Sequence, residues 1–518
     1  MLKNIIKKNS YYDSATLMLL TSKVAPEVGG SHNIAVMMAS EMNKDLMRNS
    51  GLLTDEGEAA SPNDLIFAVK ADDEETVDSA IERAMAILDE KQAQKKSTSA
   101  EKNVFDTTAE ALEQNPDAQL AVVSLPGALA HIEVKRLLKA GVNVLLFSDN
   151  VSIENENMLK DLAIDNGLLM MGPDCGTAVV NGIGLGFANK IKRGNVGIVA
   201  ASGTGLQEVM TLVSNFGGGV SQALGTGGRD LKEAIGGKMM LHALNMLEAD
   251  AQTEIIAIVS KPPSATVVEK LKEKIDSLSK PVVVCLLGDD SNLLGSTDAT
   301  VAHTLTETAQ ICLNLVATRA GSEPTTIAQR PDTERIVEQA RAALNDEQRF
   351  IRGLYCGGTL SYETQLVLAD ELEMPYSNAP LDHDYELTDI TVSKAHTILD
   401  LGDDAFTVGK PHPMIEPSLR GERLLQEALD PTTAVIVLDI EIGYGSHDEA
   451  GQILADEVRQ ARVELDKVGR SVAFFATVCG SYEDYQGYDK QVQILEDAGI
   501  TVFETNEHCA RAAVAVVK

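Results

Sequence analysis

The chain has 518 residues, a length that accommodates three or four domains. Its formal net charge is -33, and lysine and arginine form no stripe that could offset it. Because such a charge repels anions, nucleic acid and anionic membranes are excluded as partners. No apolar run reaches the ~18 residues of a membrane span, and the basic start lacks the apolar core of a signal peptide. We therefore expect a cytoplasmic α/β protein.

The first predicted domain, residues 1–100, is a small α+β domain of the ferredoxin-like kind. Its expected elements are a strand at 14–20, a helix over 32–46, a strand at 63–71 and a helix around 74–88. The polar stretch 91–103 is typical of a linker.

The second predicted domain, residues 101–190, is Rossmann-like. Apolar strands at 119–126 and 142–148 alternate with helical segments, and a third strand ends in the turn at 172–177. Asp174 in this turn is a candidate for substrate binding, or it caps the turn. Cys175 would need a nearby base to act as a nucleophile, and because none is visible locally a packed thiol is favoured.

Two further domains are predicted at 191–345 and 346–518, joined through a linker at 318–335. Their apolar runs end in Gly or Ser, as expected of parallel strands that are covered on both faces. At an offset of 155 residues, 202–208 aligns with 357–363, so that a Gly-Thr pair and a Glu coincide. We interpret the two as duplicated flavodoxin-like domains with parallel sheets.

The two matching turns are the main candidate site. Each follows an apolar strand and opens a helix, whose N-terminus offers unpaired backbone N–H groups and a partial positive charge. Glycine lets a ligand approach the backbone and hydroxyls add donors, so phosphate is the natural ligand, unless both are merely tight turns with a Thr cap. The predicted phosphate-binding residues are Ser202, Gly203, Thr204, Gly205, Gly357, Gly358 and Thr359.

Three cationic side chains are the predicted catalytic residues. Arg229 follows a glycine-rich loop and either binds a carboxylate or phosphate or serves as a surface charge at a helix start. Lys410 or His412 comes second, because a Gly- and Pro-rich loop presents both stiffly. Further candidates for substrate binding, at strand ends or in loops, are Gly227, Gly228, Lys261, Gly443, Tyr444 and Gly445. The six cysteines and nine histidines form no ligand cluster, so no metal is expected.

These motifs resemble succinyl-CoA synthetase. MGPDCGTAVV, NVGIVAASGTGLQEV and QALGTGGRDLKEAIGG are similar to its α subunit, and the last domain is similar to the carboxy-terminal domain of its β subunit. With RGLYCGGTLSYE, DLGDDAFTVGKPHPMIEP and LDIEIGYGSH, nearly the whole chain resembles the FdrA family. The resemblance implies that residues 101–190 are a Rossmann-like domain of the CoA-binding type.

The chain also departs from the synthetase. The phosphoryl-accepting histidine loop G-H-A-G-A is missing, and His303 in that region is expected to lie within the next helix. The ATP-grasp half and the glycine-rich loop for the CoA pyrophosphate are missing too. CoA is therefore left open as a ligand, and phosphate or carbamoyl phosphate is expected instead.

The FdrA resemblance implies a carbamoyltransferase subunit of allantoin and purine catabolism. The implied reaction is oxamate carbamoyltransferase chemistry, which converts oxalurate and phosphate to oxamate and carbamoyl phosphate. It implies a small anionic substrate and partner subunits in a hetero-oligomeric enzyme. The alternatives are an acyl-CoA synthetase or CoA-transferring subunit and a non-catalytic scaffold that binds an anion.

Overall fold

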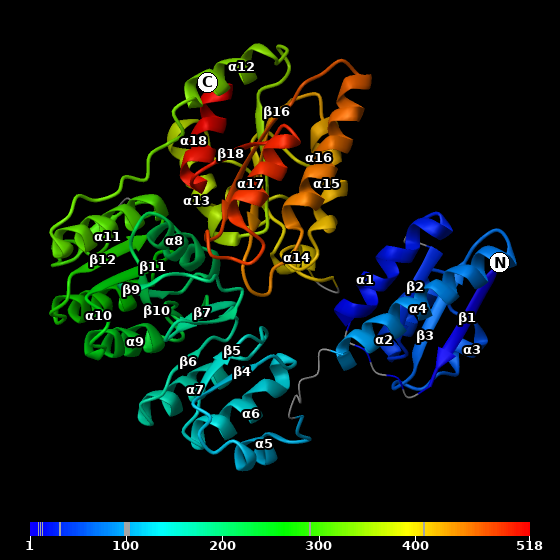
Figure 1. The fold of residues 1–518 in the computed structure, drawn as a ribbon, viewed down its shortest axis with the longest axis horizontal. Helices are drawn as coiled ribbons and strands as arrows, with labels where there is room; N and C mark the ends of the chain where they lie inside the picture. The colour runs from blue at the N-terminus through cyan, green and yellow to red at the C-terminus, as the bar shows by residue number, and fades with distance from the viewer. Residues whose placement is uncertain are drawn as a thin grey trace. The chain divides into compact units, whose positions relative to one another are not determined.

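The computed structural model describes residues 1–8, 10, 12, 14–30, 33–97, 104–289, 292–407 and 410–518. The chain forms two compact units, residues 1–105 with 408–411 and residues 106–407 with 412–518. Both units combine helices and sheets, as Figure 1 shows. Within these described ranges, no helix combines the length and apolarity that crossing a bilayer requires.

The first unit contains a three-stranded antiparallel sheet in the order β1-β3-β2, with a core between the sheet and helices α1 and α4. The elements are β1 (Leu2–Lys7), α1 (Ser14–Val24), η1 (Ala25–Val28), β2 (Ile34–Met38), α2 (Glu41–Asn49), α3 (Asp55–Glu58), β3 (Leu65–Lys70) and α4 (Glu74–Ser97).

Three local predictions in this unit are wrong in whole or in part. Of the linker expected over 91–103, residues 91–97 belong to helix α4, and 98–103 lie outside the described residues. Residues 14–20, expected as a strand, begin helix α1, because Ala, Leu and Met favour helix where strand alternation is absent. The helix expected over 32–46 is strand β2 followed by helix α2. The Ser40 hydroxyl caps α2 by accepting the Asn43 N–H, which separates the two elements.

The second unit begins with a Rossmann-like parallel sheet in the order β4-β5-β6. The elements are α5 (Thr108–Gln114), β4 (Leu120–Val123), α6 (Gly127–Lys139), β5 (Asn143–Leu146), α7 (Ile153–Asp165) and β6 (Met170–Met171). A hairpin of β7 (Thr177–Val180) and β8 (Ile183–Gly186) then leads into the next sheet.

That sheet has the order β13-β12-β11-β9-β10-β7-β8. Its five parallel strands follow the flavodoxin-like order, in which the second strand lies at one edge beside the first. The elements are β9 (Arg193–Ala200), α8 (Gly203–Asn215), β10 (Val220–Gly225), α9 (Lys238–Ala249), β11 (Ile255–Ser260), α10 (Ala265–Asp276), β12 (Val282–Leu286), β13 (Thr300–Ala302) and α11 (Leu305–Ala320).

The last sheet repeats this order as β15-β14-β16-β17-β18, so the predicted pair of flavodoxin-like domains is confirmed. The elements are α12 (Thr333–Ala342), β14 (Phe350–Tyr355), α13 (Gly358–Glu371), η3 (His383–Tyr385), β15 (Thr397–Asp400), α14 (Asp404–Thr407), η4 (Pro417–Arg420), α15 (Gly421–Leu429), β16 (Thr433–Glu441), α16 (Ala450–Lys467), β17 (Ala473–Cys479), α17 (Tyr488–Asp497), β18 (Thr501–Phe503) and α18 (Asn506–Val517).

The two flavodoxin-like domains share one hydrophobic core. Residues of α8 and α11 in the first domain pack with residues of α13 and α18 in the second. Figure 1 shows where these helices lie in the fold. Since α8 and α13 are the equivalent first helices of their domains, this packing brings the carboxyl ends of β9 and β14 together.

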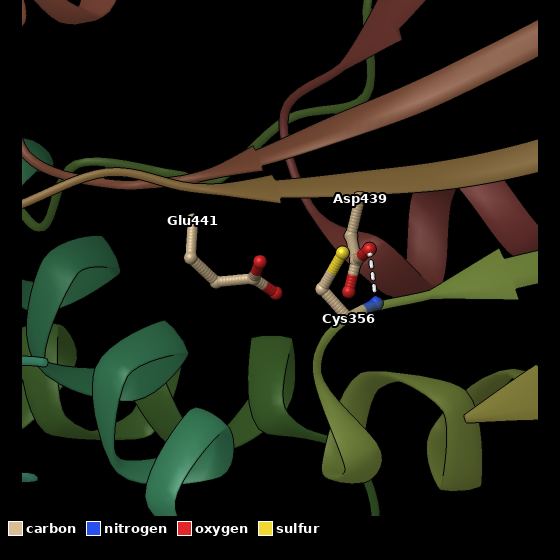
Figure 2. Close-up of side chains that lie close together, drawn as sticks. All are labelled: Cys356, Asp439 and Glu441. Carbon is tan, nitrogen blue, oxygen red and sulfur yellow. Dashed lines mark hydrogen bonds between the residues drawn. The ribbon is translucent and has the colours of Figure 1, made fainter. Parts of the chain in front are cut away.

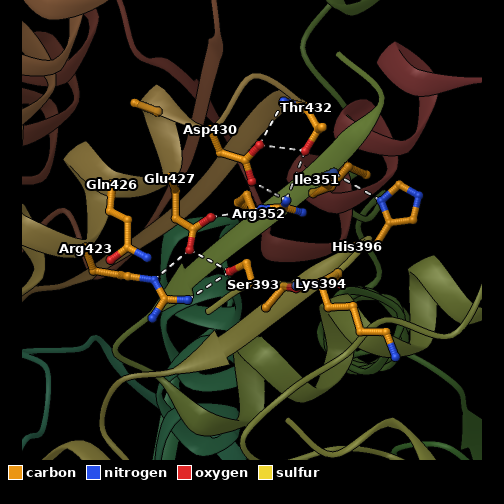
Figure 3. Close-up of polar contacts among 12 residues, drawn as sticks. Ile351, Arg352, Ser393, Lys394, His396, Arg423, Gln426, Glu427, Asp430 and Thr432 are labelled. Atoms are coloured by element: carbon orange, nitrogen blue, oxygen red, sulfur yellow. Dashed lines mark hydrogen bonds and ion pairs between the residues drawn. The ribbon is translucent and has the colours of Figure 1, made fainter. Parts of the chain in front are cut away.

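A buried ion-pair network holds strand β14 in place. Arg352 is 2% exposed, and its guanidinium binds Glu427 and Asp430, each at 2.9 Å (Figure 3). Arg423 binds the other oxygen of Glu427 at 2.6 Å. The network ties α15 to β14 and so fixes the strand that carries the second predicted turn.

Candidate functional site

The structure brings the two predicted turns into direct contact. The Ser202 and Thr359 hydroxyl oxygens are 2.5 Å apart, and the backbone N–H of Thr359 donates to the Thr204 hydroxyl at 3.1 Å. Ser202 also caps α8 by accepting the Gly205 N–H at 3.1 Å. The starts of α8 and α13 therefore point their partial positive charges at the same place.

Glycine is required where the turns meet. A Cβ atom on Gly205 would lie 2.5 Å from the Ser202 hydroxyl and 3.0 Å from the Thr359 methyl group. One on Gly358 would lie 2.5 Å from a carboxylate oxygen of Asp400. Gly203 is exposed and Gly358 is half-buried, whereas Thr204 and Thr359 are buried, so the paired turns open to solvent on one side.

Carboxyl groups line the α13 turn, and sequence reasoning missed them. Asp439 accepts the backbone N–H groups of Cys356 and Gly357 at 2.7 and 2.8 Å. Burial raises the pKa of Asp400 to about 7, with a further contribution from the charge of Asp403. Burial and then the charge of Asp439 raise the pKa of Glu441 well above its ordinary range. A signal was present, because Asp439 and Glu441 interrupt an otherwise apolar strand.

The glutamates that coincide in the sequence repeat meet at a third helix. The backbone N–H of Asn506, at the start of α18, donates to Glu208 at 3.3 Å, and its side-chain amide donates to Glu363 at 2.8 Å. Burial raises the pKa of Glu208 to about 7 and that of Glu363 to about 8. These two residues therefore fasten α8 and α13 to α18.

Arg229 lies at the seam between the Rossmann-like domain and the first flavodoxin-like domain. Its guanidinium donates to the carbonyl of Val151 at 2.7 Å and pairs with Glu156 at 2.8 Å. Beside it Lys160, which is fully buried, pairs with Glu156 at 2.8 Å and with Asp230 at 2.7 Å. Sequence reasoning missed this network, which holds α7 against the loop of Arg229.

The glycine-rich loop of Arg229 packs on the turn at 172–177. A Cβ atom on Gly227 would lie 2.3 Å from the carbonyl oxygen of Pro173. One on Gly228 would have more room, because it would lie 3.9 Å from a carboxylate oxygen of Asp174. Burial raises the pKa of Asp174 to about 6, followed by repulsion from Asp149 and Asp404, while Arg229 opposes the rise.

Cys175 is buried in the same turn. Burial raises the pKa of its thiol to about 12, which keeps the thiol protonated and agrees with a packed thiol rather than a nucleophile.

His412 lies close to the α13 turn. A Cβ atom on Gly402 would be 2.5 Å from His412 Nε2 and 2.7 Å from the Cys356 carbonyl oxygen. His412 Nδ1 accepts the Met414 N–H at 3.2 Å, and burial lowers the histidine pKa to about 4. The neutral ring therefore carries its proton on Nε2, which makes that atom a donor. The Phe187 ring packs against the His412 ring, with the two ring centres 5.8 Å apart.

The remaining candidates are spread more widely. Lys261 Nζ lies 4.2 Å from the centre of the Tyr362 ring on α13, so Lys261 borders the paired turns. Lys410 is exposed and is grouped with the first unit, so its predicted role stays a prediction.

The loop of Gly443, Tyr444 and Gly445 packs on the β7–β8 region. The Tyr444 N–H donates to the carbonyl of Ala188 at 2.7 Å, and the Gly443 N–H donates to Gln486 at 3.1 Å. A Cβ atom on Gly445 would lie 3.1 Å from the Gly186 carbonyl oxygen.

The prediction that His303 lies within a helix is wrong. It is exposed and immediately precedes Thr304, the N-cap of α11. The loop after β12 instead comes near α13 at Gly288, where a Cβ atom would lie 3.2 Å from the Tyr362 hydroxyl.

Family models match three parts of the chain. They are described as "AllF, heavy metal-associated domain" over residues 1–104, "CoA binding domain" over 191–288 and "CoA-ligase" over 354–516. The CoA-binding match falls on the first flavodoxin-like domain, and the CoA-ligase match falls on the second.

Sequence relatives fall into two groups. The YahF protein of Escherichia coli (strain K12) is 42% identical over 498 residues, which cover 96% of this chain and 95% of YahF. The succinate–CoA ligase [ADP-forming] α subunit of Aquifex aeolicus is 27% identical over 36% of this chain and 61% of that subunit. The corresponding α subunit 2 of Archaeoglobus fulgidus is 28% identical over 36% of this chain and 64% of that subunit. The chain thus spans less than two thirds of these ligase subunits.

A solved structure of ATP citrate lyase from Methanothrix soehngenii covers 76% of this chain and 72% of its own, at 19% identity and a TM-score of 0.31. That score is too low to establish a shared overall arrangement.

The chain thus contains one region similar to a CoA-binding domain and one similar to a CoA-ligase domain, each on one of the two flavodoxin-like folds. The chain belongs to the family of the Escherichia coli YahF protein. The narrower assignment to the FdrA family stays a prediction.

Proposed function

We propose that this chain is the acyl-phosphate-binding subunit of an acyl-transferring enzyme of the CoA-ligase type. The phosphoryl group would lie between the starts of α8 and α13. The observation that carries the proposal is the contact of the two turns, in which Thr359 bonds to both Ser202 and Thr204. Two helix N-termini aimed at one place form a natural site for an anion.

In the proposed reaction, an acceptor replaces phosphate on an acyl group. An acyl phosphate and CoA would give acyl-CoA and inorganic phosphate, with the CoA thiol losing its proton and phosphate leaving with the bonding electrons. The turns would stabilise the charge that grows on the departing phosphate. His412 Nε2–H is suited to polarise the acyl carbonyl oxygen, because its neutral ring donates there.

Carbamoyl transfer is the second candidate, in which phosphate attacks oxalurate and releases oxamate and carbamoyl phosphate. A specific observation favours it. The described residues between β12 and β13 include no histidine, and His412 Nε2 carries a proton rather than a free lone pair. Neither position is suited to accept a phosphoryl group, whereas phosphorolysis of a carbamoyl compound requires no such acceptor.

Partner subunits are part of the proposal. The succinate–CoA ligase relatives are named as subunits, and each is similar to 36% of this chain. We propose that residues of a partner chain complete the binding site for the second substrate, CoA or oxamate, and that the enzyme is a hetero-oligomer.

Titration calorimetry of the full chain tests the proposal. Inorganic phosphate and carbamoyl phosphate should bind, and the double variant Thr204→Val/Thr359→Val should weaken both by at least about tenfold, since a hydrogen bond to a charged group contributes about 1.5–3 kcal/mol. Thr211→Val is the matched control, because its hydroxyl bonds within α8 to the carbonyls of Gln207 and Glu208. Equal phosphate affinity in the double variant and the wild type would reject the proposal.

The same titration separates the two candidate functions. Heat from CoA added to protein that already holds acetyl phosphate supports acyl transfer to CoA. Binding of carbamoyl phosphate without any CoA heat, also in the complex with the partner subunit, supports carbamoyl transfer.

A further inference from the structure

Three potential metal ligands converge beneath the α13 turn. Cys356 follows strand β14, while Asp439 and Glu441 lie two residues apart on the neighbouring strand β16, and all three side chains are buried. One ligand atom from each lies within 4.8 Å of the other two. Figure 2 shows the Glu441 carboxylate extending toward Cys356 and Asp439.

One atom of this cluster has no hydrogen-bond partner. Glu441 is 2% exposed, and its Oε1 atom is buried without a donor. Leaving a buried carboxylate oxygen unpaired costs free energy, which a native fold seldom tolerates without a ligand. Oε1 faces the α13 turn, since a Cβ atom on Gly357 would lie only 2.7 Å from it. This unpaired oxygen points to a positively charged ligand.

We propose that Cys356, Asp439 and Glu441 bind a divalent transition-metal ion, with Zn²⁺ as the best fit. A thiolate selects borderline-soft ions over Mg²⁺ and Ca²⁺, and carboxylate oxygens complete a set that Zn²⁺ accepts. Three protein ligands leave one position of a tetrahedral ion open, as in zinc sites that bind a small molecule.

The surrounding charges balance such an ion. Arg420 is 1% exposed, and its Nη1 atom donates to the Asp439 carbonyl at 2.7 Å and lies 3.4 Å from both Asp439 Oδ1 and Cys356 Sγ. One thiolate and two carboxylates carry three negative charges, and Arg420 together with a divalent ion supplies three positive ones. The buried cluster is therefore neutral with the ion bound, which a low-dielectric interior requires.

Of this site, only the two carboxylates show in the sequence, because Asp439 and Glu441 interrupt an apolar strand. Cys356 and Asp439 are 83 residues apart, so only the pairing of β14 with β16 brings them together. The proposal does not depend on the proposed function, because it rests on the three side chains and not on the phosphate site.

Cobalt(II) titration of the full chain under reducing conditions tests the proposal. We expect one Co²⁺ ion per chain to produce a near-ultraviolet thiolate-to-cobalt charge-transfer band. The first unit cannot produce this band, because residues 1–104 contain no cysteine. Cys356→Ser should abolish the band, whereas Cys312→Ser, which removes a buried thiol from α11, should leave it unchanged.

Glu441→Gln provides a second readout in a nearly isosteric variant, should Cys356→Ser fail to fold. It should weaken Co²⁺ binding by at least about tenfold, since an amide oxygen is a poor replacement for a charged ligand. A wild-type chain without the band, a band that survives Cys356→Ser, or an unchanged affinity in Glu441→Gln would each overturn the proposal. In those cases a proton on Glu441 takes the place of the ion.

Discussion

Glu363 is a carboxyl group that the fold keeps protonated near neutral pH. It is 1% exposed, and burial raises its pKa from 4.5 to about 8 despite hydrogen bonds from Asn506 and Leu305. Because the folded state holds this proton more tightly than the unfolded chain, the stabilising contribution is complete below pH 4.5 and is lost as the pH rises through about 8. At about 1.4 kcal/mol per pH unit, the loss is at most roughly 5 kcal/mol.

The substitution Glu363→Gln removes the ionisable proton and should remove this pH-dependent loss. We expect calorimetric unfolding to show that the wild type loses more stability than the variant between about pH 5 and about pH 8.5. Glu269→Gln, at an exposed position on α10, should follow the wild type. If Glu363→Gln and the wild type lose stability in parallel, Glu363 titrates alike in the folded and the unfolded chain. That result would refute the burial argument.

Two further substitutions test the packing around the site. Lys160→Met leaves Asp230 buried without its cation and Glu156 paired with Arg229 alone, so denaturant unfolding should show a loss of about 3–5 kcal/mol. The exposed Lys135→Met should change little, and a neutral result for Lys160→Met would contradict the role of this network. Gly357→Ala places a Cβ atom 2.7 Å from Glu441 and 3.0 Å from the Thr204 methyl group, so we expect a loss of about 1–3 kcal/mol and weaker phosphate binding. Gly176→Ala, whose nearest neighbour would lie at 3.5 Å, should preserve both properties, and equal behaviour of the two variants would show that the turns have more room than described.

The duplicated architecture was predictable because local sequence patterns indicate it. Short apolar runs followed by a Gly-Thr turn occur twice, 155 residues apart, and each run forms the first of five parallel strands that share one strand order. The same repeat located the turns that meet in the structure. Two errors of helix against strand fell in the first unit, at residues 14–20 and 34–38, because periodicity alone does not distinguish helix from strand in short apolar segments.

The side chains around the turns could not be found in this way. Asp439 reaches the Gly357 N–H only because β16 pairs with β14, and Lys160 reaches Asp230 only because α7 packs on a loop 70 residues away. Arg229 and Asp174 were separate candidates in the sequence, and both the effect of Arg229 on Asp174 and the pairing of Arg229 with Glu156 depend on the same packing. Contacts of this range are fixed by tertiary structure and leave little trace in a single sequence.

The central claim is that the starts of α8 and α13 together bind one phosphoryl group. A crystal structure of the full chain grown with carbamoyl phosphate or inorganic phosphate tests it most directly. The account predicts tetrahedral density within hydrogen-bonding distance of the backbone N–H groups of Gly203 and Gly358 and of the Thr204 and Thr359 hydroxyls. Phosphate density at Arg229 or Lys261 with the paired turns closed on each other would contradict it.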